Sequence, residues 1–135
     1  MTIIDGKQTA AEIRAELKEK VLKLTGNNLQ VPGLVAILVG ENPASKIYVR
    51  YKEKACAEIG FYSEVVRLET ETTEDELLTI VEKFNNDDKI NGILVQLPLP
   101  QHINEDKIIQ AISPDKDVDG FHPVSIGKMI LGQET

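Results

Sequence analysis

The chain has 135 residues, of which 41% are hydrophobic and 27% charged, and both length and composition are typical of one globular domain. The net charge of −7 argues against nucleic acid as a partner, because nucleic-acid-binding proteins present a basic surface. No apolar run approaches the roughly 20 residues that span a bilayer, and the single cysteine, Cys56, excludes an internal disulfide and fits a reducing compartment.

The first half of the chain alternates between helix and strand patterns. Residues 7–24 have the spacing of an amphipathic helix, and residues 34–39, LVAILV, form an apolar run of strand length. A second helix is predicted from Asn42, a suitable N-cap, with Pro43 in its first turn, as far as Gly60. Its expected buried side chains recur every three or four residues: Ala44, Ile47, Tyr51, Ala55 and Ile59.

The second half continues this alternation. Residues 61–68 are typical of a second strand, Thr73 opens a third helix with a capping box, and residues 92–97 predict a third strand that we expect to be central and buried. Short helices are expected over 103–112 and 124–131. Strands separated by helices need crossover connections, so the sequence predicts a three-layer α/β/α domain with a mainly parallel sheet covered on both faces.

The acidic segment SPDKDVDGFHP contains half of a calcium signature. Asp115, Asp117, Asp119 and Gly120 occupy the first, third, fifth and sixth positions of an EF-hand loop. The twelfth position, which should be a bidentate glutamate, is Ile126. We therefore expect no metal here, and on local sequence alone the segment is best interpreted as a solvated acidic turn.

The segment VGENPASK resembles a phosphate-binding loop only superficially. Ser45 stands where a second glycine is required, and Ile47 replaces the Ser or Thr that would hold magnesium. A capped helix start is the better interpretation.

The second helix contains the first candidate for chemistry. Tyr48 and Lys52 are four residues apart, so their side chains lie on one face, beside the expected apolar stripe. Partial desolvation lowers the pKa of a lysine and lets it exchange protons near neutral pH. The alternative is that Lys52 extends its amine into water and Tyr48 merely packs. Further positive charge in this helix comes from Lys46, Arg50 and Lys54.

Gln96 is the single polar residue within GILVQLPLP. A buried amide must find hydrogen-bond partners or cost about 1–3 kcal/mol. Ligands of open parallel sheets bind beyond the carboxyl ends of the strands, where we expect Gln96. A core glutamine bonded to neighbouring backbone is the alternative.

Taken together, three segments resemble a known family. YVRYKEKA, GILVQLPLP and PDKDVDGFHP, in this order, are similar to the signatures of the bifunctional methylenetetrahydrofolate dehydrogenase/methenyltetrahydrofolate cyclohydrolases. IIDGKQTAAEIR and VGENPASKIYV also match, so the resemblance covers essentially the whole chain.

The resemblance implies a fold like the N-terminal domain of amino-acid dehydrogenases. It implies a multifunctional oxidoreductase and hydrolase of one-carbon metabolism, which oxidises 5,10-methylenetetrahydrofolate to 5,10-methenyltetrahydrofolate with NADP or NAD and hydrolyses the product to 10-formyltetrahydrofolate. It also implies folate substrates, a homodimer, a cytoplasmic location and a link to purine biosynthesis, with no nucleic acid, membrane or metal as partner.

The resemblance further implies roles for five residues. Lys52 corresponds to the catalytic lysine, Tyr48 to the tyrosine that positions the folate, and Gln96 to the glutamine that bonds and tunes the lysine. Asp119 corresponds to the aspartate that holds the pterin ring, and Ser45 to a small polar position in the substrate site.

Residues 1–135 are therefore expected to be the substrate-binding catalytic domain alone. The family's C-terminal Rossmann-type domain binds NADP or NAD, and this sequence has no G-x-G-x-x-G pattern. We expect no cofactor-binding residues here, no tight NADP binding and no hydride transfer by this chain alone. The alternative is a non-catalytic folate-binding or interaction module.

Overall fold

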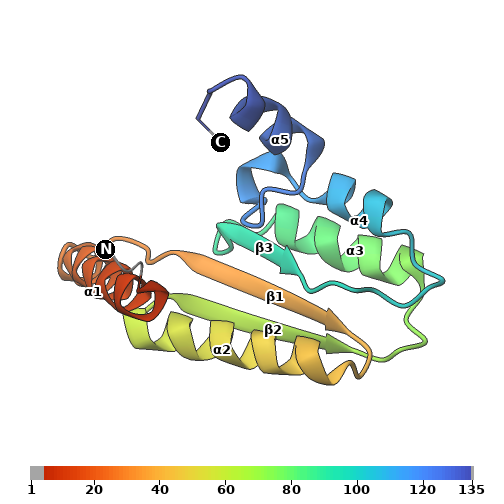
Figure 1. The fold of residues 1–135 in the computed structure, drawn as a ribbon, viewed down its shortest axis with the longest axis horizontal. Coiled ribbons are helices and arrows are strands. Elements are labelled where there is room, and N and C mark those ends of the chain that lie inside the picture. Colours follow the sequence, from red (N-terminus) through yellow and green to blue (C-terminus); the bar gives the residue numbers. More distant parts are fainter. Residues whose placement is uncertain (1–4, 135) are drawn as a thin grey trace.

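A computed structural model describes residues 5–134, which form a three-stranded parallel sheet between layers of helices (Figure 1). The strands are β1 (Gly33–Val39), β2 (Tyr62–Leu68) and β3 (Gly92–Val95), in the order β2-β1-β3. The predicted α/β fold with a parallel sheet is confirmed.

The expected central position of the third strand is wrong, because β3 pairs only with β1 and forms an edge of the sheet. β3 also ends at Val95, so Gln96 follows the strand instead of lying inside it. The backbone amide of Gln96 still donates to the Ile37 carbonyl oxygen at 2.8 Å, which keeps this residue aligned with the sheet.

The helices are α1 (Gly6–Gly26), α2 (Pro43–Ile59), α3 (Glu74–Asn85), α4 (Glu105–Ala111) and α5 (Pro123–Ile130). The predicted start signals are confirmed: Asn42 caps α2, and Thr73 and Glu76 form a reciprocal capping box on α3. Among residues 5–134, no helix combines the length and apolarity that a bilayer crossing requires.

Each face of the sheet has its own core. On one face, Ala36 and Leu38 of β1 pack with Val49 of α2 and Leu94 of β3. The other face packs against α3 and α4, as Figure 1 shows, through buried sheet residues Val35, Ile37, Val39, Ile93 and Val95. Gln96 follows Leu94 by two residues, so the pleat directs its side chain toward α2.

The predicted buried stripe of α2 is wrong in its rotation. Ile47 and Tyr51 are 52% and 66% exposed. Of the predicted stripe, only Ile59 is buried and Ala55 partly buried. The other residues that face the sheet are Ser45, Val49 and Cys56, with Lys52 partly buried among them. At about 100° per residue, this is a shift of roughly a quarter turn, and it places two polar side chains on the inner side of the helix.

Candidate functional site

Lys52 and Gln96 meet between α2 and the end of β3. Lys52 Nζ donates to Gln96 Oε1 at 3.3 Å, and both residues are partly buried. Gln96 Nε2 donates to the Leu97 carbonyl oxygen at 2.9 Å. Because the amide nitrogen is engaged there, the amide oxygen faces the lysine. The two residues therefore come together as expected.

Ser45 lies two helical turns before Lys52 on the same inner face of α2. Its side chain is buried, and its Oγ donates to the Leu97 carbonyl oxygen at 3.4 Å. This carbonyl thus accepts from both Ser45 and Gln96, and the Leu97–Pro98 peptide that follows is cis. Sequence reasoning missed this acceptor, since no side-chain pattern marks a backbone carbonyl.

The acidic segment lies beside the outer edge of β3. Asp117 forms a backbone bridge with Ile93, and its carboxylate accepts from the amides of Gly120 at 3.1 Å and His122 at 2.9 Å. Gly120 has φ of +68°, a conformation that suits glycine. Asp117 is therefore a turn-forming residue, as predicted, and both of its oxygens are engaged in closing the turn.

Asp119 lies in the same acidic loop, two residues after Asp117. The residue is exposed, but surrounding protein partly withdraws its carboxyl from water. This desolvation raises the pKa of Asp119, the charge of Lys52 offsets part of the rise, and the charge of Asp117 adds to it. No ion pair between Lys52 and Asp119 forms among the described residues, so Lys52 acts on Asp119 through its charge alone.

Tyr48 precedes Lys52 by one turn of α2 and is 60% exposed. Its ring is thus available to a ligand. The five residues expected in the site come from α2, from the end of β3 and from the acidic loop. Within residues 5–134, no group of three or more His, Cys, Asp or Glu side chains is arranged to hold a metal ion.

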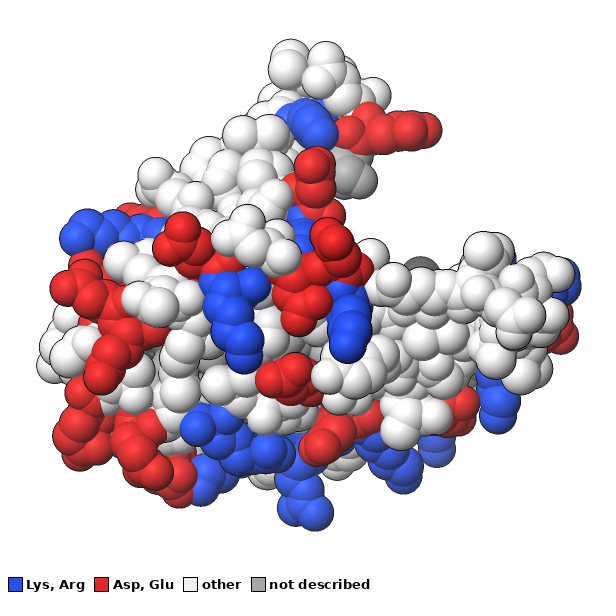
Figure 2. All heavy atoms as spheres, turned by 180° about the vertical axis from the view of Figure 1, so that it is seen from behind, with Lys and Arg blue, Asp and Glu red and all other residues white. Residues whose placement is uncertain are grey.

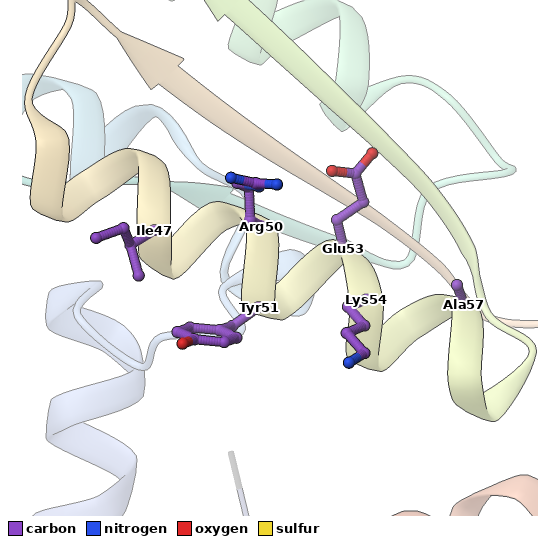
Figure 3. A pocket seen from close by; sticks show the side chains of 6 residues that line it. All are labelled: Ile47, Arg50, Tyr51, Glu53, Lys54 and Ala57. Atoms are coloured by element: carbon purple, nitrogen blue, oxygen red, sulfur yellow. The ribbon is translucent and has the colours of Figure 1, made fainter.

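A shallow groove runs along the outer side of α2, with a volume of about 520 Å³. Figure 3 shows Tyr51 and Lys54 projecting from one side of the helix, and Arg50 and Glu53 from the other. We call this the α2 groove; its lining residues are Ile47, Arg50, Tyr51, Glu53, Lys54 and Ala57. Sequence reasoning had assigned Ile47 and Tyr51 to the core and so did not predict it.

Seen from behind, acidic and basic side chains are interspersed over the surface, which is deeply notched between α5 and α1 (Figure 2). The described residues therefore leave an open side to which a ligand has access.

Comparison with known proteins gives consistent matches. A family model described as the tetrahydrofolate dehydrogenase/cyclohydrolase catalytic domain matches residues 4–119. The chain is 57% identical over 133 residues to the bifunctional protein FolD of Bacillus mycoides, covering 98% of this chain and 46% of that protein. It is 62% identical over 130 residues to FolD of Halothermothrix orenii, covering 96% of this chain and 46% of that protein.

Solved structures of proteins with the same name superpose closely on this chain. The bifunctional FolD of Campylobacter jejuni superposes with a TM-score of 0.95 at 49% identity, covering all of this chain and 48% of that one. The Trypanosoma brucei enzyme, solved with NADP and an inhibitor, gives 0.92 at 36% identity, covering 99% of this chain and 46% of that one. The chain spans about half the length of the curated relatives it matches.

Proposed function

The chain belongs to the tetrahydrofolate dehydrogenase/cyclohydrolase family, and we propose that it supplies the folate site and the proton-transfer lysine of a bifunctional enzyme. That enzyme would oxidise 5,10-methylenetetrahydrofolate to 5,10-methenyltetrahydrofolate with NADP or NAD and hydrolyse the product to 10-formyltetrahydrofolate. The observation that supports this most is the contact between Lys52 and Gln96, flanked by Asp119.

Lys52 is suited to the hydrolytic step. Water adds to the cationic methenyl carbon and must lose a proton, and the bond from this carbon to the ring nitrogen N5 then breaks as N5 gains one. As that bond breaks, the added hydroxyl loses its own proton and becomes the formyl carbonyl, so the products are the N10-formyl compound and one released proton. The Lys52 amine would accept the proton that water loses and return it to N5. Gln96 Oε1 would orient the amine for both transfers.

The remaining site residues would bind the substrate. The carboxylate of Asp119 would accept two hydrogen bonds from the ring N–H and the amino group of the pterin, a match of geometry as well as charge. The exposed ring of Tyr48 would lie against the folate. Ser45 would act less directly, because its hydroxyl is buried and bonded to the Leu97 carbonyl.

The described residues do not fit a dinucleotide cofactor. Such cofactors place their pyrophosphate on free amides at a glycine-rich helix start. At the start of α2, the Asn42 side chain already accepts from the amides of Ala44 and Ser45, and the nearby Lys46 is paired with Glu41. We therefore propose that NADP or NAD binds to a separate Rossmann-type domain, and that residues 1–135 are the substrate domain.

The proposal also covers the oligomeric state, the cellular location and the metabolic role of the enzyme. The enzyme would act as a cytoplasmic homodimer that supplies formyl groups to purine biosynthesis. The single cysteine, Cys56, which is buried and unpaired, fits a reducing compartment.

A folate-binding module without chemistry is the second candidate. Two observations favour it: Tyr48 is 60% exposed, and the Lys52–Gln96 contact of 3.3 Å is longer than the 2.7–2.9 Å typical of charge-assisted hydrogen bonds. A loosely held lysine in an open site would bind a folate and transfer protons poorly.

Single-turnover hydrolysis distinguishes the two candidates. With the chain in excess over 5,10-methenyltetrahydrofolate, we expect loss of the methenyl absorbance faster than in buffer. Lys52→Met should slow this catalysed rate by about 10²–10⁴-fold, the usual contribution of general acid–base catalysis. Lys83→Met on α3 is the matched control and should leave the rate unchanged, with circular dichroism confirming that both variants fold.

Binding of the substrate without any acceleration would favour the non-catalytic module. If the chain binds no folate, or if Lys52→Met hydrolyses the substrate at the wild-type rate, the proposed role of Lys52 is wrong.

A further inference from the structure

Glu105 lies outside the candidate site but is hydrogen-bonded to the segment that leaves it. This residue opens α4, and its side chain is partly buried. Its Oε1 accepts from the backbone amide of Leu99 at 2.9 Å. Residues 98–100 include two prolines, which have no amide hydrogen, so Glu105 binds the single backbone donor of this stretch.

The start of α4 is itself held in place. The turn before it is closed by the Ile103 amide, which donates to the carbonyl oxygen three residues earlier at 2.9 Å. Leu99 and Ile103 are both buried in the core on the α3 and α4 side of the sheet. At the N-cap, the Asn104 amide donates to Glu74 Oε2 of α3 at 2.8 Å. Glu105 is therefore a fixed point to which Leu99 is attached.

One residue, Pro98, separates this contact from the candidate site. The Leu97 carbonyl precedes Pro98 and accepts from Ser45 Oγ at 3.4 Å and Gln96 Nε2 at 2.9 Å. The Leu99 amide belongs to the peptide group after Pro98. Peptide groups are planar, and the proline ring fixes φ at about −65°. Since only rotation about ψ of Pro98 remains between the two groups, an acceptor that holds the amide also restricts the direction of the carbonyl.

The direction of the Leu97 carbonyl matters for Lys52. While Gln96 Nε2 donates to this carbonyl, Gln96 Oε1 is directed at Lys52 Nζ, 3.3 Å away. If the carbonyl turned away, the amide group would be free to rotate. A rotated amide would present its NH₂ group, which is a donor, and would no longer accept from the lysine.

We propose that Glu105 is a positioning residue for the proton-transfer lysine. It holds the Leu99 amide, and through it the Leu97 carbonyl that orients Gln96. The consequence for hydrolysis rests on the proposed function, whereas the effect on Gln96 is measurable in the ligand-free chain. Glu105 acts on the rate of proton transfer and leaves the pterin contacts of Asp119 unchanged.

NMR of the isotope-labelled 135-residue chain without ligand tests the geometric step. The reporter is the side-chain amide of Gln96, assigned by its absence from the spectrum of Gln96→Met. In Glu105→Met, which removes the acceptor at similar volume, this resonance should shift and its protons should exchange with water about three- to tenfold faster. Glu105→Gln keeps an oxygen at the same reach and should resemble wild type. Glu82→Met, the same substitution at an exposed position of α3, is the control and should change neither property.

Single-turnover hydrolysis of 5,10-methenyltetrahydrofolate measures the consequence for the rate. At saturating chain concentration, Glu105→Met should react about tenfold more slowly, a part of the full contribution of the lysine, with nearly unchanged affinity for the substrate. Glu105→Gln should restore the rate. A merely structural role would lower stability in urea without moving the Gln96 resonance or the rate of the folded variant.

If Glu105→Met does not fold, Glu105→Asp takes its place, because it keeps the charge but is one methylene too short to reach Leu99. An unchanged Gln96 resonance in the folded variant, a displacement that Glu105→Gln does not reverse, or a displaced resonance with an unchanged rate would each show that the inference is wrong. If the wild-type chain hydrolyses no substrate, the proposed function fails, and the Gln96 resonance alone decides whether Glu105 positions this side chain.

Discussion

Asp119 is partly desolvated in the folded chain, which makes its ionised form less favourable. Its pKa is raised above the ordinary value, mainly by desolvation and only partly offset by Lys52. A carboxyl whose pKa is raised by folding destabilises the folded state when it is ionised. This destabilisation shrinks once the pH falls below the pKa in the folded state, and it is gone below the pKa in the unfolded state. In the proposed site, the donor groups of a pterin would compensate this partly desolvated carboxylate.

We therefore predict that Asp119→Asn stabilises the chain at about pH 7 by only a few tenths of a kcal/mol, since solvent screens an exposed charge. The gain should shrink as the pH is lowered and Asp119 becomes protonated. Urea denaturation at a series of pH values measures both effects. A variant less stable than wild type at neutral pH would show that attraction to Lys52 outweighs desolvation.

At the scale of one element, α2 connects the cap, the candidate site and the α2 groove. The side chain of Asn42 accepts from the amides of Ala44 at 3.0 Å and Ser45 at 3.1 Å, which fixes the first turn. Ser45 in that turn contacts the Leu97 carbonyl, and Lys52 two turns later contacts Gln96. The start of the helix thus sets the position of the site residues.

Asn42→Ala is expected to destabilise the chain by about 1 kcal/mol, because two helix amides lose their acceptor. Urea unfolding measures this loss. Asn42→Asp retains an acceptor at the same place and should restore most of the stability. Equal stabilities for all three proteins would show that the cap does not hold α2 in place.

The rotation of α2 shows where sequence patterns mislead. Ile47 and Tyr51 are apolar and have helical spacing, so hydrophobic periodicity places them in the core. The structure instead turns Ser45 and Lys52 toward the sheet and leaves both apolar side chains more than half exposed. Local patterns are expected to fail at functional sites, where the inner face of a helix must present polar groups.

At the scale of the whole molecule, the alternation of strands and helices could be predicted from sequence. Residues 34–39 and 92–95 are continuous apolar runs because helices cover both faces of the parallel sheet. The position of β3 at the edge of the sheet could not be predicted, since strand order depends on crossover connections and not on the composition of any strand.

The same long-range arrangement creates the candidate site. The residues of this site are spread along the chain from Ser45 to Asp119. Strand β3 brings two of the segments together, because Gln96 directly follows its last residue and Asp117 forms a bridge with Ile93 in this strand. The family resemblance predicted which residues form the site, and periodicity placed Tyr48 and Lys52 on one face. The Leu97 carbonyl, the closed Asp117 turn and the α2 groove required the three-dimensional structure.

The central claim is that Tyr48, Lys52, Gln96 and Asp119 of this chain line one folate site. Titrating the isotope-labelled 135-residue chain with tetrahydrofolate, and following each backbone amide by NMR, tests it most directly. We predict saturable shifts confined to residues 45–54, 96–97 and 117–121, with α3 and α4 unaffected. Shifts centred on α3 and α4, or no saturable shifts at millimolar ligand, would contradict the claim.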